Sequence, residues 1–174
     1  EAPSITVDNF TVAENANTGA VLATATGLDP EGSNVSYFLS GTGSDNFQID
    51  SNGNITLNGD LDYETTESYE LTIFASDGEF TVPKTITVTV SDSNEAPSLS
   101  SSVAFNSFLE NTSVGTTIAT SESSDPESDT VSYSLSGTGS DKFSVDAEGK
   151  VTLASSLDYE TAPSDSINLN ATDG

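Results

Sequence analysis

The acidic residues are the part of this sequence whose types and spacing are best suited to chemistry. There are 28 Asp and Glu against 3 basic residues, for a net charge of −25, and six of the acids in the first half recur 96 residues later. The first set is Glu14, Asp29, Glu31, Asp62, Glu64 and Asp77, and the second is Glu110, Asp125, Glu127, Asp158, Glu160 and Asp173. A short polar segment between the sets adds Asp92, Ser93, Asn94 and Glu95.

Carboxylate and carbonyl oxygens are the ligands that Ca²⁺ prefers in proteins. The chain has no His and no Cys, which excludes the usual zinc sites, thiolate sites and Ser–His catalysis. In extended chain, residues i and i+2 point the same way, so the pairs Asp29/Glu31 and Asp62/Glu64 can converge on one ion. Carboxylates ~4 Å apart repel by ~4 kcal/mol near a protein surface, and a divalent ion removes that cost. A single acid in a turn is most simply a solvated side chain, but the recurrence of the whole set favours a metal site.

Other function classes fit the sequence less well. The Asp62/Glu64 and Asp29/Glu31 pairs could be taken for a glycosidase pair, but both pairs recur and no substrate cleft is indicated, so no enzyme is expected. Three Lys residues do not provide the basic surface that nucleic acid requires. No apolar run approaches the ~20 residues of a membrane helix.

The acids belong to a long internal repeat. The segment 40–47, Ser-Gly-Thr-Gly-Ser-Asp-Asn-Phe, recurs at 136–143 with one substitution, and Leu-Asp-Tyr-Glu-Thr at 61–65 recurs at 157–161. A repeat of this length is a whole domain. We expect repeat 1 over residues 1–94, repeat 2 over 95–174 and an extended linker at 91–97, where Pro97 disfavours helix.

Within each repeat the hydrophobic pattern is that of β-strands. Apolar residues alternate with polar ones over 69–76 and over 85–90, and shorter candidate strands lie at 4–7, 10–12, 21–26, 35–39, 47–49, 55–57 and 131–135. Asn52-Gly53 and Glu148-Gly149 predict tight hairpins. We therefore predict an all-β protein, two tandem seven-stranded Greek-key β-sandwiches. Gly174 corresponds to Gly78, so we expect the second repeat, as given, to be without its last strand.

Taken together and in order, these motifs resemble cadherin repeats in their bacterial form. The resemblance covers nearly the whole chain, and each motif is weakly specific by itself. It rests on Glu14-Asn15, Asp29-Pro-Glu31, Leu61-Asp-Tyr-Glu64, Ala75-Ser-Asp-Gly78 and Asp92-Ser-Asn-Glu-Ala-Pro97.

The resemblance implies up to three Ca²⁺ at the junction between the two repeats. The implied ligands are Glu14, Asp62 and Glu64 from repeat 1, Asp92, the Ser93 carbonyl, Asn94 and Glu95 from the linker, and Asp125, Glu127 and Asp173 from repeat 2. Asp29, Glu31 and Asp77 form an N-terminal half-site, and Glu110, Asp158 and Glu160 a C-terminal one. Glu95, Ala96 and Glu127 depart from the residues usual in animal cadherins, which leaves two or three ions open.

The function expected from the resemblance is a Ca²⁺-rigidified extender or adhesion segment of a secreted or surface-bound bacterial adhesin. The alternative is a carbohydrate- or cell-binding module. Tyr37, Phe38, Tyr63, Phe74, Phe105 and Phe108 could supply its aromatic platform, although most of them are expected in the core. An exposed aromatic pair on one face would favour this alternative. Homophilic adhesion through a Trp-bearing strand is not expected, because the chain has no Trp.

Overall fold

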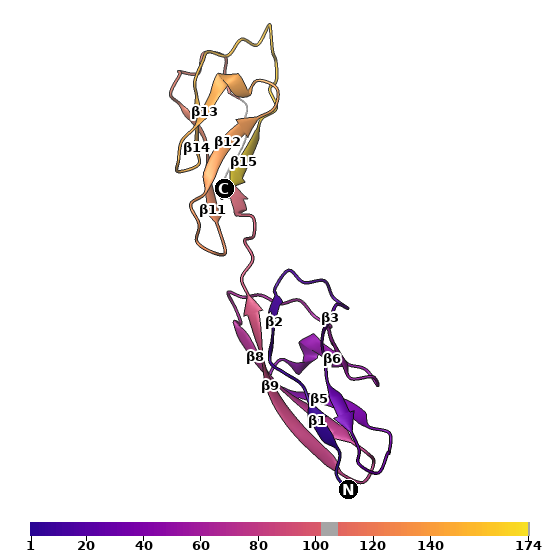
Figure 1. The fold of residues 1–174 in the computed structure, drawn as a ribbon. Helices are drawn as coiled ribbons and strands as arrows, with labels where there is room; N and C mark the ends of the chain where they lie inside the picture. The colour runs from indigo at the N-terminus through magenta and orange to yellow at the C-terminus, as the bar shows by residue number, and fades with distance from the viewer. Residues whose placement is uncertain (102–107, 174) are drawn as a thin grey trace. The chain divides into compact units, whose positions relative to one another are not determined.

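The fold was analysed in a computed structural model that describes residues 1–101 and 108–173. The chain forms two compact units, Glu1–Ser93 and Asn94–Gly174, each treated separately below. Both consist of β-strands and short connections (Figure 1). Among the described residues, none of the helices has the length and apolar character needed to cross a membrane.

The first unit is a β-sandwich. Its elements are β1 (Ser4–Thr6), β2 (Phe10–Ala13), β3 (Val21–Thr24), β4 (Thr26–Leu28), β5 (Ser36–Gly41), the 3₁₀ turn η1 (Ser44–Asn46), β6 (Phe47–Ile49), β7 (Asn54–Leu57), β8 (Ser68–Ser76) and β9 (Thr81–Ser91). One layer has the strand order β2-β9-β8-β5, and the other contains β3-β7-β6 and the pair β1-β4. The β2–β9 pairing is parallel, whereas β8 pairs antiparallel with both β5 and β9.

The alternation along β8 and β9 produces the core, as predicted. Leu71 and Ile73 of β8 and Val88 of β9 have no exposed surface, while the residues between them lie on the outer face. Ile55 of β7, equally buried, belongs to the same cluster, which shows that the two layers pack face to face. Period-2 patterning therefore places one side of each strand in the interior.

The strand expected over residues 21–26 is interrupted at Ala25. The register of β3 on β7 shifts between Val21 and Ala23, and the Ala25 N–H donates to the Gly53 carbonyl oxygen at 2.8 Å. Gly53 has φ +82°, and a Cβ there would lie 2.0 Å from the Ala25 oxygen. The Asn52-Gly53 hairpin predicted from the sequence thus forms between β6 and β7, and its glycine lets the neighbouring backbone approach.

The second unit repeats this plan with fewer strands. Its elements are β10 (Ser98–Ser101), β11 (Thr117–Ser124), β12 (Ser132–Ser136), the 3₁₀ turn η2 (Ser140–Lys142), β13 (Phe143–Val145), β14 (Lys150–Leu153) and β15 (Asn168–Thr172). One sheet has the order β10-β11-β14-β13, and the other is the pair β12-β15. Within the described part of this unit no strand corresponds to β9. Its buried cluster comprises Ile118, Ala119, Val151 and Leu153.

Candidate calcium-binding ends

The candidate ligands lie at the ends of each unit, where strands give way to loops. In the first unit, carboxylate oxygens of Glu14, Glu64 and Asp92 all lie within 4.8 Å of one another. Glu14 follows β2, Glu64 lies in the loop before β8, and Asp92 follows β9. Pairing of β2 with β9 brings the first and last of these together. We call this group the Glu14 cluster.

Glu14 is buried, with only 7% of its surface exposed. Its Oε2 accepts a hydrogen bond from the Tyr63 N–H at 2.6 Å, and its Oε1 accepts one from the Ser93 N–H at 2.7 Å. Asn15 also contacts this segment, because its Nδ2 donates to Ser93 Oγ at 2.7 Å. These contacts fix the segment after β9 against the loop before β8.

Asp62 is expected from the sequence to lie with Glu14 and Glu64, but its carboxylate is not among the three that form the Glu14 cluster. Its Oδ1 accepts a hydrogen bond from the Thr65 N–H at 2.8 Å, and its carbonyl accepts one from the Thr66 N–H. The side chain therefore caps its own turn, which is a common role for Asp. In this geometry Asp62 orders the loop that carries Glu64.

The second unit has a corresponding group, which we call the Glu110 cluster. Oxygens of Glu110, Asp158 and Glu160 lie within 4.8 Å of one another, and all three side chains are exposed. The Tyr159 N–H donates to Glu110 Oε2 at 3.2 Å, as the Tyr63 N–H does to Glu14. Hydrogen bonds from the Thr161 hydroxyl and then from its N–H lower the pKa of Asp158 below its usual value.

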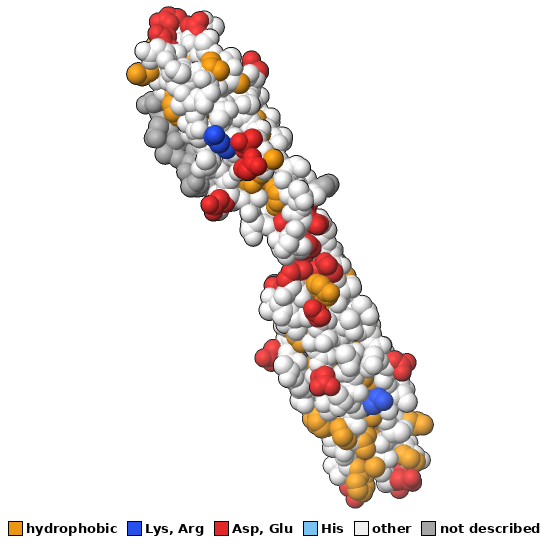
Figure 2. Space-filling model, turned by 90° about the vertical axis from the view of Figure 1, so that its left-hand side faces the viewer, with side chains coloured by type: hydrophobic (Ala, Val, Ile, Leu, Met, Phe, Trp, Pro, Cys, Tyr) orange, Lys and Arg blue, Asp and Glu red, His pale blue; other side chains and the backbone are white. Residues whose placement is uncertain are grey.

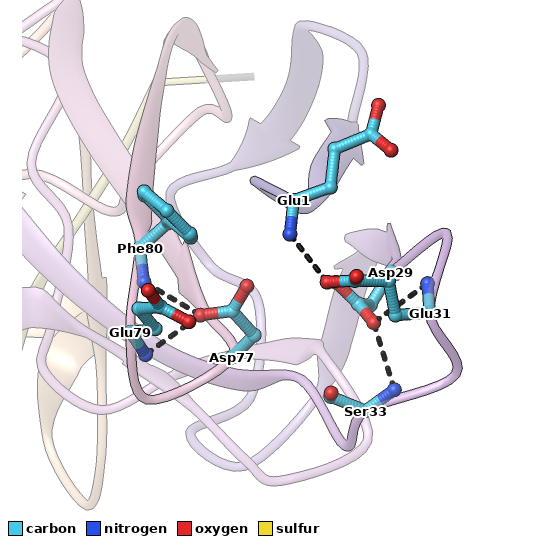
Figure 3. A network of polar contacts seen from close by, with 7 residues as sticks. All are labelled: Glu1, Asp29, Glu31, Ser33, Asp77, Glu79 and Phe80. Atoms are coloured by element: carbon cyan, nitrogen blue, oxygen red, sulfur yellow. Dashed lines mark hydrogen bonds and ion pairs between the residues drawn. The ribbon is translucent and has the colours of Figure 1, made fainter.

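The opposite end of the first unit carries Asp29, Glu31 and Asp77, shown in Figure 3. Asp29 is 5% exposed, and its Oδ1 accepts hydrogen bonds from the Glu31 and Ser33 N–H groups at 3.0 and 2.8 Å. Its Oδ2 is buried and has no hydrogen-bond partner among the described residues. Glu31 pairs with the Glu1 ammonium group. The three acids are not brought within 4.8 Å of one another.

Asp77 has its own local partners in this region. Its Oδ1 accepts hydrogen bonds from the Phe80 and Glu79 N–H groups at 2.6 and 2.8 Å (Figure 3). The bond from the Phe80 N–H is the main reason why the pKa of Asp77 lies below its usual value. The carboxylate therefore remains ionised and orders the β8–β9 connection.

The corresponding end of the second unit shows the same buried oxygen. Asp125 Oδ1 accepts a hydrogen bond from the Asp129 N–H at 2.8 Å, while Asp125 Oδ2 and Glu127 Oε1 are buried without a partner among the described residues. The Glu95 N–H donates to Glu127 Oε2 at 3.4 Å, and Asn94 Nδ2 donates to Asp173 Oδ2 at 2.7 Å. Within this unit four of the predicted residues thus form two pairs, Asn94 with Asp173 and Glu95 with Glu127, while Asp125 is bonded to Asp129.

The donor chemistry at these ends fits Ca²⁺. Every candidate side-chain ligand offers oxygen, and each repeat retains an unpaired buried Asp oxygen at the same position, Asp29 in one and Asp125 in the other. A buried anionic oxygen without a hydrogen bond is costly unless a cation compensates for it. Sequence comparison of the repeats identified these two residues, but their burial and their unpaired oxygens follow only from the folded loops.

The aromatic residues divide between core and surface. Tyr37 and Tyr63 both pack against the core, as expected. The Tyr37 hydroxyl accepts a hydrogen bond from the Gly27 N–H at 2.6 Å. Phe38 and Phe74 instead stack on the outer face of the first unit. Phe108 lines a cavity in the second unit, and Phe105 lies outside the described residues.

Comparison with known proteins identifies the family. A family model described as "Cadherin domain" matches residues 8–101 and again residues 105–174. The chain belongs to the cadherin domain family. Members of this family are adhesion proteins and the chain is not an enzyme, as the sequence analysis expected.

The matching relatives are animal proteins. The chain is 33% identical to mouse Cadherin-related family member 1 over 95% of this chain and 20% of that protein. It is 32% identical to the Drosophila Fat-like cadherin-related tumor suppressor homolog over 97% of this chain and 4% of that protein. The chain thus spans a fifth or less of these relatives. They give no support to the bacterial origin expected from the sequence.

Solved cadherin structures share the fold. The crystal structure of human Protocadherin-24 EC1-2 (form II) has a TM-score of 0.72 and 24% identity, covering 99% of this chain and 88% of that one. Drosophila N-cadherin EC1-4 has a TM-score of 0.64 and 20% identity, covering 99% of this chain and 48% of that one. At this identity the likeness concerns the fold, and it supports two tandem β-sandwich repeats.

Proposed function

We propose that this chain is a Ca²⁺-binding segment of an extracellular adhesion protein, in which Ca²⁺ bound at the ends of each repeat stiffens the connection to the next. The repeats are proposed to span residues 1–94 and 95–174, with the linker at 91–97. The observation that carries the proposal is the matching placement of acids in both repeats. Glu14 and Glu64 correspond to Glu110 and Glu160, and Asp29 and Asp125 have the same buried, unpaired oxygen.

Electrostatics gives the reason for a cation. Three carboxylates within 4.8 Å of one another repel by several kcal/mol in total near a protein surface. Each loop would spread apart without a neutralising ion, and a divalent cation converts that repulsion into attraction. Glu14, held by two backbone N–H groups, is a preformed ligand that needs little reorganisation.

The ligand sets follow from the resemblance and the geometry of each unit. For the junction we propose Glu14, Glu64, Asp92, the Ser93 carbonyl, Asn94, Glu95, Asp125, Glu127 and Asp173, with Asp62 ordering its loop or entering when the ion binds. Asp29, Glu31 and Asp77 would serve a preceding repeat, and Glu110, Asp158 and Glu160 a following one. The bacterial adhesin context remains a hypothesis without support from the relatives.

Calcium titration of the 174-residue chain tests the proposal. We expect heat of binding in calorimetry, and a melting temperature that rises with Ca²⁺ and falls with chelator. Binding at a hundredfold excess over Kd adds about 2.7 kcal/mol of stability. Glu64→Ala and Asp125→Asn should each lower the number of ions bound, whereas Glu148→Gln removes one charge from a hairpin and serves as the control.

Stiffening has its own readout. Small-angle scattering should give a narrower distribution of maximum dimensions with Ca²⁺ than with chelator, because a bound ion restricts the linker. A chain that binds no Ca²⁺ and melts identically in both conditions would show that the acids are only solvated surface. Binding without any change in scattering would refute the stiffening role alone.

A further inference from the structure

A stacked aromatic pair, with one exposed and one partly buried ring, distinguishes the outer face of the first unit. Phe38 of β5 lies directly opposite Phe74 of β8, and their rings stack with centroids 4.5 Å apart and planes 4° from parallel. Phe38 is 46% exposed. Pro83 of β9 pairs with Phe74 in register, so an apolar row crosses three strands. Figure 2 shows hydrophobic side chains gathered over the lower part of this unit.

The fold does not require this pair. The positions 96 residues later are Ser134 and Asn170, which also lie directly opposite one another, on β12 and β15. The second repeat thus builds the same strand pairing with two polar side chains. A stacked pair on the outer face that lies outside the buried core cluster and has no counterpart in the second repeat indicates a role in binding.

Hydroxyl groups flank the aromatic row on both sides. On one side of the aromatic row Thr81 Oγ1 donates to Ser76 Oγ at 3.0 Å. On the other side, Thr72 and Thr85 hydroxyls lie 3.2 Å apart. In a chain of net charge −25 such a face suits a ligand that is neutral and itself carries hydroxyl groups.

The pair also borders a hollow. β5 and β6 are the outer strands of their sheets, and between them lies a shallow cavity of about 370 Å³, to which Phe38, Ser44, Asp45 and Gln48 all contribute. Small-molecule sites combine an apolar wall with a few polar groups in a cavity of roughly 300–1,000 Å³. The Asp45 carboxylate and the Gln48 side chain are both exposed. Gln48 Nε2 donates to Asn58 Oδ1, so Gln48 can meet a ligand through its amide oxygen, and Asp45 through its carboxylate.

We propose that the Phe38–Phe74 pair and the adjoining hollow form a binding site for a neutral saccharide. The apolar C–H face of a pyranose ring packs on an aromatic ring, and its hydroxyls are satisfied by short polar side chains nearby. Asp45 can accept hydrogen bonds from two adjacent sugar hydroxyls, and charge-assisted bonds of this kind are the stronger ones. This site lies on the side of the sandwich and is separate from the acidic clusters of the proposed function.

The test exchanges the residues of the two repeats. The ¹⁵N-labelled chain is titrated, in Ca²⁺ and in chelator, with cello-, malto-, manno-, galacto- and chito-hexaose, and with hyaluronan as an anionic probe. At least one neutral hexaose should shift the amide signals of residues 38, 48 and 74. Binding should weaken about tenfold or more in Phe38→Ser/Phe74→Asn, as expected for loss of ~1.4 kcal/mol of contact. Hyaluronan should not bind.

Two controls keep the test decisive. The Ser134→Phe/Asn170→Phe variant transplants the pair to repeat 2 and leaves the original site intact. Asp45→Ala removes a carboxylate from η1, and Gln48→Ser shortens an exposed side chain of β6 without changing a buried residue. Both should weaken binding even if the Phe variant folds poorly. The proposal is overturned if no hexaose shifts these signals, or if the Phe variant binds as tightly as the original chain. It is also overturned if sedimentation shows that the face mediates pairing with a second copy of the chain.

Discussion

The two repeats have different side-chain contacts at the edge of their cores, although they share the acidic residues at their ends. Phe47 of the first repeat is 4% exposed and contacts Tyr69 edge to face at 5.5 Å. In the second repeat Asp165 replaces that tyrosine and forms an ion pair with Lys142, Nζ to Oδ2, at 2.9 Å. One sequence position thus carries an aromatic contact in one copy and a salt bridge in the other.

The end residues show the opposite behaviour. Tyr63 and Tyr159 donate equivalent backbone hydrogen bonds to Glu14 and Glu110, and Asp29 and Asp125 have equivalent unpaired oxygens. The sides of the sandwich therefore tolerate exchange of one type of contact for another, whereas the ends repeat the same acids and some of the backbone hydrogen bonds to them. This contrast supports a shared task at the ends and separate tasks on the sides.

The largest difference in stability between the two units should come from truncating a core residue at the same position in each repeat. Leu71 has no exposed surface, while Ile167 at the corresponding position is only partly buried. We expect Leu71→Ala to destabilise the first unit by about 3 kcal/mol, and Ile167→Ala to destabilise the second by roughly half as much, since it removes less buried area. Hydrogen exchange of amides in β8 and in β15 reports the two units separately. Equal losses would show that the second core is as well packed as the first.

The second contrast concerns the acids that anchor each cluster. In chelator, Glu14→Ala leaves the Tyr63 and Ser93 N–H groups without their acceptor and should destabilise the first unit by about 2–3 kcal/mol. Glu110 is exposed and accepts one longer bond, so Glu110→Ala should change stability by less than about 1 kcal/mol. Chemical denaturation of the whole chain, followed by the NMR signals of each unit, measures the two losses of stability separately. Stabilisation by Glu14→Ala would mean that repulsion within its cluster outweighs these hydrogen bonds.

The sequence predicted the strands and the family better than the detailed geometry of the clusters. Alternation at Leu71 and Ile73 and the hairpin glycine at Gly53 are local signals, and both were confirmed. Asp62 and Asp158 both accept a hydrogen bond from the N–H three residues later, yet Asp158 belongs to the Glu110 cluster and Asp62 does not belong to the Glu14 cluster, a difference that the identical sequence motif does not reveal. The stacking of Phe38 on Phe74 depends on the register between β5 and β8, which a single sequence does not reveal.

A smaller contrast lies in the loops that hold Asp29 and Asp125. Gly32 has φ +80°, and Ser128 at the corresponding position has φ +64°, a left-handed conformation that disfavours residues with a Cβ. Gly32→Ser should destabilise the first unit by about 1 kcal/mol. Ser128→Gly should stabilise the second by about 0.5 kcal/mol, since the entropy of glycine in the unfolded chain offsets part of the relief. Thermal unfolding of both single variants checks whether stability falls in Gly32→Ser and rises in Ser128→Gly. Two changes of the same sign would show that local hydrogen bonds, rather than backbone strain, decide these loops.

The smallest effect concerns the ionisation of Asp158, whose pKa is lowered chiefly by the Thr161 hydroxyl and next by the Thr161 N–H. A carboxylate with a lowered pKa in the folded state contributes stability above its unfolded pKa and loses it as the pH falls through the folded pKa. Thr161→Val keeps the shape but removes the hydroxyl, so it should raise the pKa of Asp158 toward its ordinary value and move this loss to higher pH. Carboxyl ¹³C titration of the chain in chelator measures the shift directly. The proposed Ca²⁺ binding needs the ionised carboxylate, so under that proposal the same variant should release Ca²⁺ from the Glu110 cluster at a higher pH than the original chain does. An unchanged titration would show that the Thr161 N–H alone holds the charge.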